Sequence, residues 1–169
     1  DDALNYTFLD LLLLAALHVE PRLTVDFEEL EQLGAALRTE RSTLLAAGLS
    51  DLLGRLDLPP STLLSTIKSA LVVRAWTRLG SAAAVADELD CIESDADRVV
   101  EATHRVLLAM AAIAAVETET ESALSPKTST LTERLKALAR MVAAGLDSGP
   151  ATLTLIEGIG PIMARRLME

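Results

Sequence analysis

Apolar residues recur every three to four positions along most of the chain, which is the spacing of one face of an α-helix. The clearest case follows Pro59, where six apolar positions from Leu64 to Leu79 keep this period. Prolines, glycines and capping residues divide the pattern into separate helices. The helices that we predict cover residues 6–17, 27–38, from Ser42 or Thr43 to 56, from Pro60 or Ser61 to 79, 82–89, from a cap at Ser94 or Asp95 to 115, and 131–144.

Two interruptions suggest how the chain is organised. Residues 117–130 are polar and include Pro126, so we expect a loop or linker there. Ser148-Gly149-Pro150 is expected to form a joint before the last motif. We therefore predict a helical domain over residues 1–125, followed over residues 126–169 by a linker, one helix and a terminal motif.

Composition fixes the fold class. Half of the residues are hydrophobic but only 2% are aromatic. Leu and Ala dominate over the β-branched and aromatic residues that favour strands. The sequence therefore predicts an all-α protein, a bundle of several helices.

Charge is distributed unevenly along the chain. The net charge is −10; residues 1–125 carry −12, whereas residues 126–169 carry +2. Phosphate contacts by Lys and Arg supply most non-specific affinity for nucleic acids, so the acidic part is a poor non-specific binder. The C-terminal part, residues 126–169, is therefore the region where negative charge least opposes contact with a nucleic acid.

Several classes of site are not expected in this chain. Cys91 is the only cysteine, which excludes an internal disulfide and a cysteine metal cluster, and we expect a cytoplasmic protein, nucleoid-associated in a prokaryote. No glycine-rich loop precedes Lys-Ser or Lys-Thr, so an ATP-hydrolysing motor must lie outside the chain. The longest apolar run, residues 8–17, is too short for a membrane span, and we expect no membrane partner. The Asp1-Asp2 start resembles no signal peptide or initiation site, so we expect a piece of a longer protein.

Acidic pairs such as Glu28/Glu29 and Asp87/Glu88 have no arrangement that assigns acid and base roles. We therefore predict no catalytic site in this chain. Trp76 is expected to anchor the core, and His104 to lie at the surface.

A glycine pair near the C-terminus forms the first motif that suggests a function. Residues 155–167 look like a helix-hairpin-helix, in which Gly158, Ile159 and Gly160 form the turn and Pro161 opens the second helix. Glycines allow a tight turn and a close approach to a phosphate, and amides at the start of a helix can donate hydrogen bonds to it. The motif indicates contact with a nucleic-acid backbone, not with base sequence.

The side chains of this motif divide into two groups. We expect Arg165 and Arg166 to approach the nucleic acid, whereas Glu157 adds unfavourable negative charge. The apolar contact between the two short helices is expected from Leu155, Ile159, Ala164 and Leu167. The alternative is an ordinary joint between helices with a glycine C-cap.

A second resemblance covers most of the chain. Residues 69–76, the short helix at 82–89 and residues 95–102 resemble, in this order, the helical ratchet domain of superfamily 2 DExH-box DNA-repair helicases of the archaeal type. The break at Pro21 is similar too, so the resemblance runs from about Tyr6 to the chain end. Members of that family also end in a helix-hairpin-helix.

The resemblance implies roles for two arginines. In that family a long helix contacts single-stranded DNA through an arginine and, two turns later, through a stacking tryptophan. Arg98 matches the arginine, and Arg105 stands where the tryptophan is expected. A guanidinium plane can also stack on a base, so Arg105 can keep a weaker version of that role. Alternatively, both arginines are surface residues that pair with Glu101.

These features predict the non-catalytic C-terminal region of an ATP-dependent DNA helicase. Its expected partners are single-stranded or forked DNA and the motor domains of the same chain, where ATP and magnesium would bind; the chain itself needs no cofactor. The alternative is an acidic helical module that binds another protein. A third possibility, duplex recognition by residues 82–115, is disfavoured by the many acidic residues there.

Overall fold

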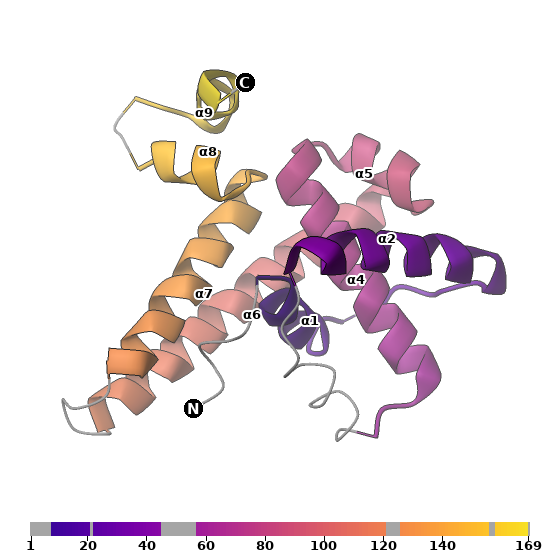
Figure 1. Ribbon diagram of the computed structural model, residues 1–169, viewed down its shortest axis with the longest axis horizontal. Coiled ribbons are helices and arrows are strands. Elements are labelled where there is room, and N and C mark those ends of the chain that lie inside the picture. Colours follow the sequence, from indigo (N-terminus) through magenta and orange to yellow (C-terminus); the bar gives the residue numbers. More distant parts are fainter. Residues whose placement is uncertain (1–7, 21, 45–56, 121–125, 156–157, 169) are drawn as a thin grey trace.

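The computed structural model describes residues 8–20, 22–44, 57–120, 126–155 and 158–168. Within these ranges the chain forms eight α-helices and a short 3-10 turn, without any strand (Figure 1). The all-α, multi-helix fold predicted from periodicity and composition is confirmed. The elements are α1 (Phe8–Ala16), η2 (Phe27–Glu29), α2 (Leu30–Leu44), α4 (Pro60–Leu79), α5 (Ala82–Leu89), α6 (Glu93–Thr120), α7 (Pro126–Ala144), α8 (Ser148–Leu153) and α9 (Pro161–Met168).

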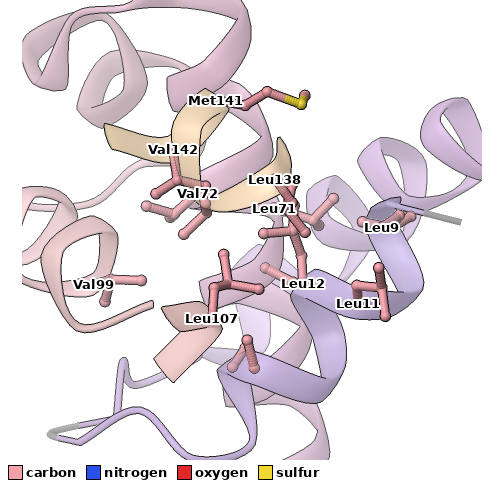
Figure 2. Packing of buried hydrophobic residues seen from close by; sticks show 14 of the residues in the cluster. Leu9, Leu11, Leu12, Leu71, Val72, Val99, Leu107, Leu138, Met141 and Val142 are labelled. Atoms are coloured by element: carbon pink, nitrogen blue, oxygen red, sulfur yellow. The ribbon is translucent and has the colours of Figure 1, made fainter. Parts of the chain in front are cut away.

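The core lies where α1, α4, α6 and α7 meet. Figure 2 shows Leu12 of α1, Leu71 of α4, Leu107 of α6 and Leu138 of α7 converging there. Each of these leucines is at most 3% exposed. Burial of such a side chain stabilises the fold by roughly 1.5–3 kcal/mol. The core includes α7, so it continues across the boundary that we predict after residue 125.

The corner from α4 to α6 follows the sequence prediction closely. Pro60 begins α4, and Gly80 ends it with a φ of +64°, a conformation that favours glycine. The Ser81 hydroxyl accepts a hydrogen bond from the Ala84 N–H at 3.4 Å and caps α5. Asp90 ends α5 in the left-handed region, with a φ of +47°. Turn chemistry that is local in sequence therefore sets the direction of α6.

The longest helices extend further than predicted. The Asp95 and Ala96 amides donate to the Ile92 carbonyl at 2.9 and 3.0 Å, so α6 starts at Glu93 and not after a cap at Ser94 or Asp95. It continues to Thr120, five residues beyond the predicted end. The predicted loop at 117–130 is wrong for residues 117–120 and 126–130, which are helical. Pro126 opens α7, because proline is well suited to the first turn of a helix.

Two further predictions need correction near the N-terminus. Residues 27–29 form a 3-10 turn, in which the Asp26 amide donates to the Glu29 carboxylate at 2.8 Å. The predicted break at Ser42 or Thr43 is wrong, because α2 continues through both residues to Leu44. Serine and threonine can remain inside a helix when no proline or glycine stops it. The rest of that predicted helix, up to residue 56, lies outside the described residues.

The predicted joint at Ser148-Gly149-Pro150 is the first turn of α8. The Ala151 amide donates to the Asp147 carbonyl at 2.9 Å, which starts the helix, and Pro150 is compatible with a first turn. Figure 1 shows α7 running back alongside α6 to carry α8 and α9 at its far end. The glycine hairpin is therefore held at one end of the bundle.

In the described part of the chain, one stretch meets the length and composition of a membrane span. It is Glu93–Val116 in α6, with a mean hydropathy of 1.6, and 39% of its apolar window is buried. The core helix of a soluble protein meets the same criterion, and α6 packs against both α7 and α4. This observation is weak evidence for a membrane, and the expected absence of a membrane partner stays a prediction.

Candidate nucleic-acid interface

Arg98 and Arg105 lie on the same exposed face of α6. They are seven positions apart, which is almost two full turns of an α-helix. Their side chains are 57% and 66% exposed. Arg98 pairs with Asp95, and Arg105 donates to Glu101 at 2.7 Å. Exposed pairs of this kind contribute at most about 1 kcal/mol, so a phosphate can replace the carboxylates at little cost.

The same face of α6 changes character towards its C-terminus. Leu108 is 48% exposed and Ile113 is 62% exposed, and both flank the line that continues from Arg98 through Arg105. The helix thus presents two charged pairs followed by an apolar surface. Leu108 and Ile113 are not among the candidates predicted from the sequence, because an apolar residue in a helix is more often buried. In the sequence, Leu108 and Ile113 do not stand three or four positions from the buried Leu107, and this spacing indicates a different face of the helix.

A pocket of about 380 Å³ opens beside Arg98 at the start of α6. Its charged lining residues nearly balance: they are Arg22, Lys68, Arg98, Asp26, Glu29, Asp90 and Asp95. Cys91 also lines it, and burial raises the pKa of this thiol, as do the neighbouring carboxylates, against the opposing effect of Lys68. The pocket therefore has no strong preference for an anion.

Lys68 lies within this lining and was not identified from the sequence. Its ammonium pairs with Glu29 and donates to the Thr24 carbonyl at 3.2 Å, with only 6% of its side chain exposed. Burial acts to raise the pKa of Glu29. This effect is outweighed by hydrogen bonds from Lys68 and from the Asp26 amide, together with the positive charge of Lys68, so the pKa lies below 4.5. The signal in the sequence was a lysine within an apolar helical stripe, which needs a buried acidic partner. Lys68 is thus engaged inside the protein.

The glycine hairpin is open to solvent. Gly158 has a φ of +87°, and a Cβ at Gly158 or Gly160 would meet no atom within 4 Å. Internal crowding therefore does not exclude side chains at these positions, and the open outer surface leaves room for a phosphate backbone. Ile159 is half-buried and packs against the core. Ile162 and Met163 follow in the first turn of α9, where amides have no partner inside the helix.

The predicted apolar contact of the hairpin is only partly correct. Ala164 is fully buried, and Ile159 packs inward. Leu155 and Leu167 are wrong as contact residues, because they are 63% and 60% exposed. The first helix ends at Leu153, which leaves Leu155 in the turn that follows it. Leu167 is exposed because α9 docks through its Ala164 side.

Arg165 and Arg166 occupy different environments. Arg165 is half-buried and donates two hydrogen bonds, to the Arg78 carbonyl at 2.9 Å and to the Gly145 carbonyl at 2.5 Å. Arg166 is exposed. This difference is not visible in the sequence, since the carbonyls that Arg165 contacts are 87 and 20 residues away. Arg166 is the better placed of the two to reach a ligand.

No group of three or more His, Cys, Asp or Glu side chains in the described ranges could hold a metal ion. No protein-family model matches the chain, and no curated protein matches it either. The resemblance to helicase ratchet domains therefore depends on the residues and on the order of the helices.

Proposed function

We propose that this chain is the non-catalytic C-terminal region of an ATP-dependent DNA helicase, where it guides single-stranded DNA. The observation that carries the proposal is the exposed face of α6, on which Arg98 and Arg105 lie two turns apart. Two exposed guanidinium groups on one face of a long helix can contact phosphates of the same strand. The resemblance to the ratchet helix concerns these same two positions.

The hairpin supports the same proposal from a second position. Gly158 and Gly160 are exposed, and the first-turn amides of α9 are suited to a phosphate oxygen. Arg166 adds one exposed positive charge beside them. These groups recognise a sugar-phosphate backbone without reading bases. A strand that passes both α6 and the hairpin would be held at two contact sites, which we call the two stations.

The charge of the chain sets the strength that this binding can reach. With a net charge of −10, the protein repels nucleic acid at long range, and the arginines on α6 are partly neutralised by Asp95 and Glu101. Binding by the chain alone should be weak and sensitive to salt. Motor domains of the same protein, which would bind ATP and magnesium, would raise the local concentration of the strand.

The test is a fluorescence-anisotropy titration of labelled single-stranded DNA at several salt concentrations. We compare the wild type with Arg98→Ala/Arg105→Ala, and use Lys136→Ala/Arg140→Ala on exposed positions of α7 as the charge-matched control. Loss of two phosphate contacts should weaken binding and reduce the salt slope by about 1.4. The control should reduce affinity less. Equal affinities for the wild type and the α6 variant would refute the proposal.

A second candidate is a protein-interaction module. It is favoured by the acidic charge together with exposed apolar side chains at Leu108 and Ile113 on α6 and at Ile162 and Leu167 on α9. A contiguous patch of exposed apolar side chains is typical of docking surfaces for other proteins. Absence of DNA binding at low salt, together with a stable complex with a defined protein that is lost on Leu108→Ser/Ile113→Ser, would favour this reading.

A further inference from the structure

The C-terminal ends of α4 and α7 meet beside the hairpin, and we call this contact the α4–α7 joint. Gly80 ends α4, and Gly145 follows α7. A Cβ added at Gly145 would lie 3.3 Å from the Gly80 Cα and 3.1 Å from the Trp76 ring, so the two turns are in close contact. The last carbonyls of an α-helix have no partner within it and carry partial negative charge. The joint therefore presents acceptors from two helices side by side.

Arg165 of α9 satisfies acceptors from both helices at once. Its Nη1 donates to the Arg78 carbonyl near the end of α4, and its Nη2 donates to the Gly145 carbonyl that follows α7. The planar guanidinium can bridge two such acceptors, which a single ammonium group does less well. A Cβ on Gly80 would lie 2.2 Å from Nη2, so the guanidinium occupies the space that the glycine leaves. Arg165 thus joins α4, α7 and α9.

We propose that Arg165 is a positioning residue that fixes the hairpin relative to α6 and does not itself bind nucleic acid. This inference rests on the proposed function, because Arg165 would align the two stations that contact DNA, α6 and the hairpin. Ala164 beside it is fully buried, whereas Arg166 and the glycine turn face solvent. Docking through Arg165 therefore leaves the phosphate-binding side of the hairpin outward.

Alignment of the two stations matters most for a strand long enough to reach both. When the hairpin is fixed, the second contact is intramolecular and benefits from a high effective concentration. When the hairpin moves relative to α6, it must become ordered on binding. The entropic cost of this ordering removes part of the gain in affinity. A short oligonucleotide that reaches only one station does not depend on this alignment.

The first test measures the position of the hairpin without DNA. Spin labels are attached in a Cys91→Ser background at Ala112→Cys on α6 and Met163→Cys on α9, which are both exposed positions. Pulsed electron paramagnetic resonance then measures the distance between the two labels. The parent should give a narrow distance distribution, as should the control Arg166→Gln. Arg165→Gln should broaden it, and so should Gly80→Ala, which displaces the guanidinium. Circular dichroism checks that the bundle remains folded, and a narrow distribution in a folded Arg165→Gln variant would overturn the proposal.

The second test compares oligonucleotides of about 6 and about 25 nucleotides, which should reach one and both stations respectively. Arg165→Gln should weaken binding of the long strand by about tenfold and leave the short strand nearly unchanged, because only the linked contact is lost. Arg166→Gln should weaken any strand that reaches the hairpin. Equal losses for both lengths in Arg165→Gln would mean that Arg165 contacts DNA directly, which overturns the proposal. If the wild type binds neither strand, the proposed function fails, while the distance measurement still decides whether Arg165 positions the hairpin.

Discussion

The indole N–H of Trp76 donates to the main-chain carbonyl of Val142 at 2.7 Å, which links α4 to α7 through a side chain. Trp76 is half-buried and packs against the core, and its ring also lies against Gly145. A tryptophan N–H that leaves water needs an acceptor, and here a carbonyl near the end of α7 supplies it. The α4–α7 joint is therefore fixed by a polar bond as well as by apolar contact.

Trp76→Phe should test this joint. The substitution keeps an aromatic ring but removes the donor, which should cost about 1 kcal/mol of the free energy of unfolding, plus a smaller loss of contact. Urea denaturation followed by circular dichroism measures it, because the variant loses the only tryptophan of the chain. Ile92→Ala, at a position that is 68% exposed, is the control and should change stability little. An unchanged stability of Trp76→Phe would show that the bond contributes nothing.

The sequence was informative where structure is set by local chemistry. Gly80 and Ser81 mark the end of α4 and the start of α5 where they were expected, because a left-handed turn and a cap depend on neighbouring residues only. The loop that we predict around Pro126 is wrong, because the sequence alone does not distinguish a proline that opens a helix from one that breaks it. Packing of α7 along α6 is a tertiary feature that periodicity does not reveal.

The candidate site shows the same limit. The exposure of Arg98 and Arg105 was predictable, since neighbouring acidic residues on the same helix favour a solvated face. The different environments of Arg165 and Arg166 were not, because the acceptors of Arg165 come from the distant ends of α4 and α7. Lys68 and Glu29 are likewise separated by 39 residues, and nothing in the sequence pairs them.

Lys68→Met should destabilise the fold strongly. The Lys68 and Glu29 side chains are 6% and 11% exposed, so removing the ammonium leaves a buried carboxylate without its ion pair. The expected cost is about 3–5 kcal/mol, far above that of a surface pair. Lys68→Met/Glu29→Gln should recover more than half of it, because the amide can still accept from the Asp26 amide. Urea midpoints of the three proteins measure this, and a cost below about 1 kcal/mol for the single variant would contradict it.

Acid should weaken the fold through Glu29. Its pKa in the folded protein lies below 4.5, so the folded state favours the ionised carboxylate. The stabilisation is complete above the unfolded pKa and is lost as pH falls through the lower folded pKa. The difference in the free energy of unfolding between wild type and Glu29→Gln should thus be largest near neutral pH and shrink below pH 4.5. A difference that stays constant from neutral pH into this acid range would exclude a titrating Glu29.

Cys91 should react slowly with thiol reagents in the native protein. Burial raises the pKa of its thiol, as do Asp95, Glu29 and Asp90, with Lys68 opposing them. Less thiolate is then present at neutral pH, and thiolate is the reacting species. Alkylation with iodoacetamide at pH 7.5 should therefore be slower in native protein than in urea-unfolded protein, followed by mass spectrometry. Equal rates in the two states would show that the pocket does not shield the thiol.

Arg105→Trp should strengthen binding of single-stranded DNA. Arg105 is 66% exposed on the face that also carries Arg98, so an indole at this position has room to meet a base. Stacking of one base on an aromatic side chain is worth about 1–3 kcal/mol. This gain should exceed the contribution of the phosphate contact that Arg105 gives up, because the arginine must first leave its pair with Glu101 to make that contact. Affinity should therefore rise by about tenfold and should depend less steeply on salt, because a charge–phosphate contact is replaced by stacking. Arg140→Trp, on an exposed position of α7, is the matched control and should not tighten binding. If both substitutions raise affinity equally, the gain is a non-specific effect of an exposed indole, and α6 has no special place on the path of the strand.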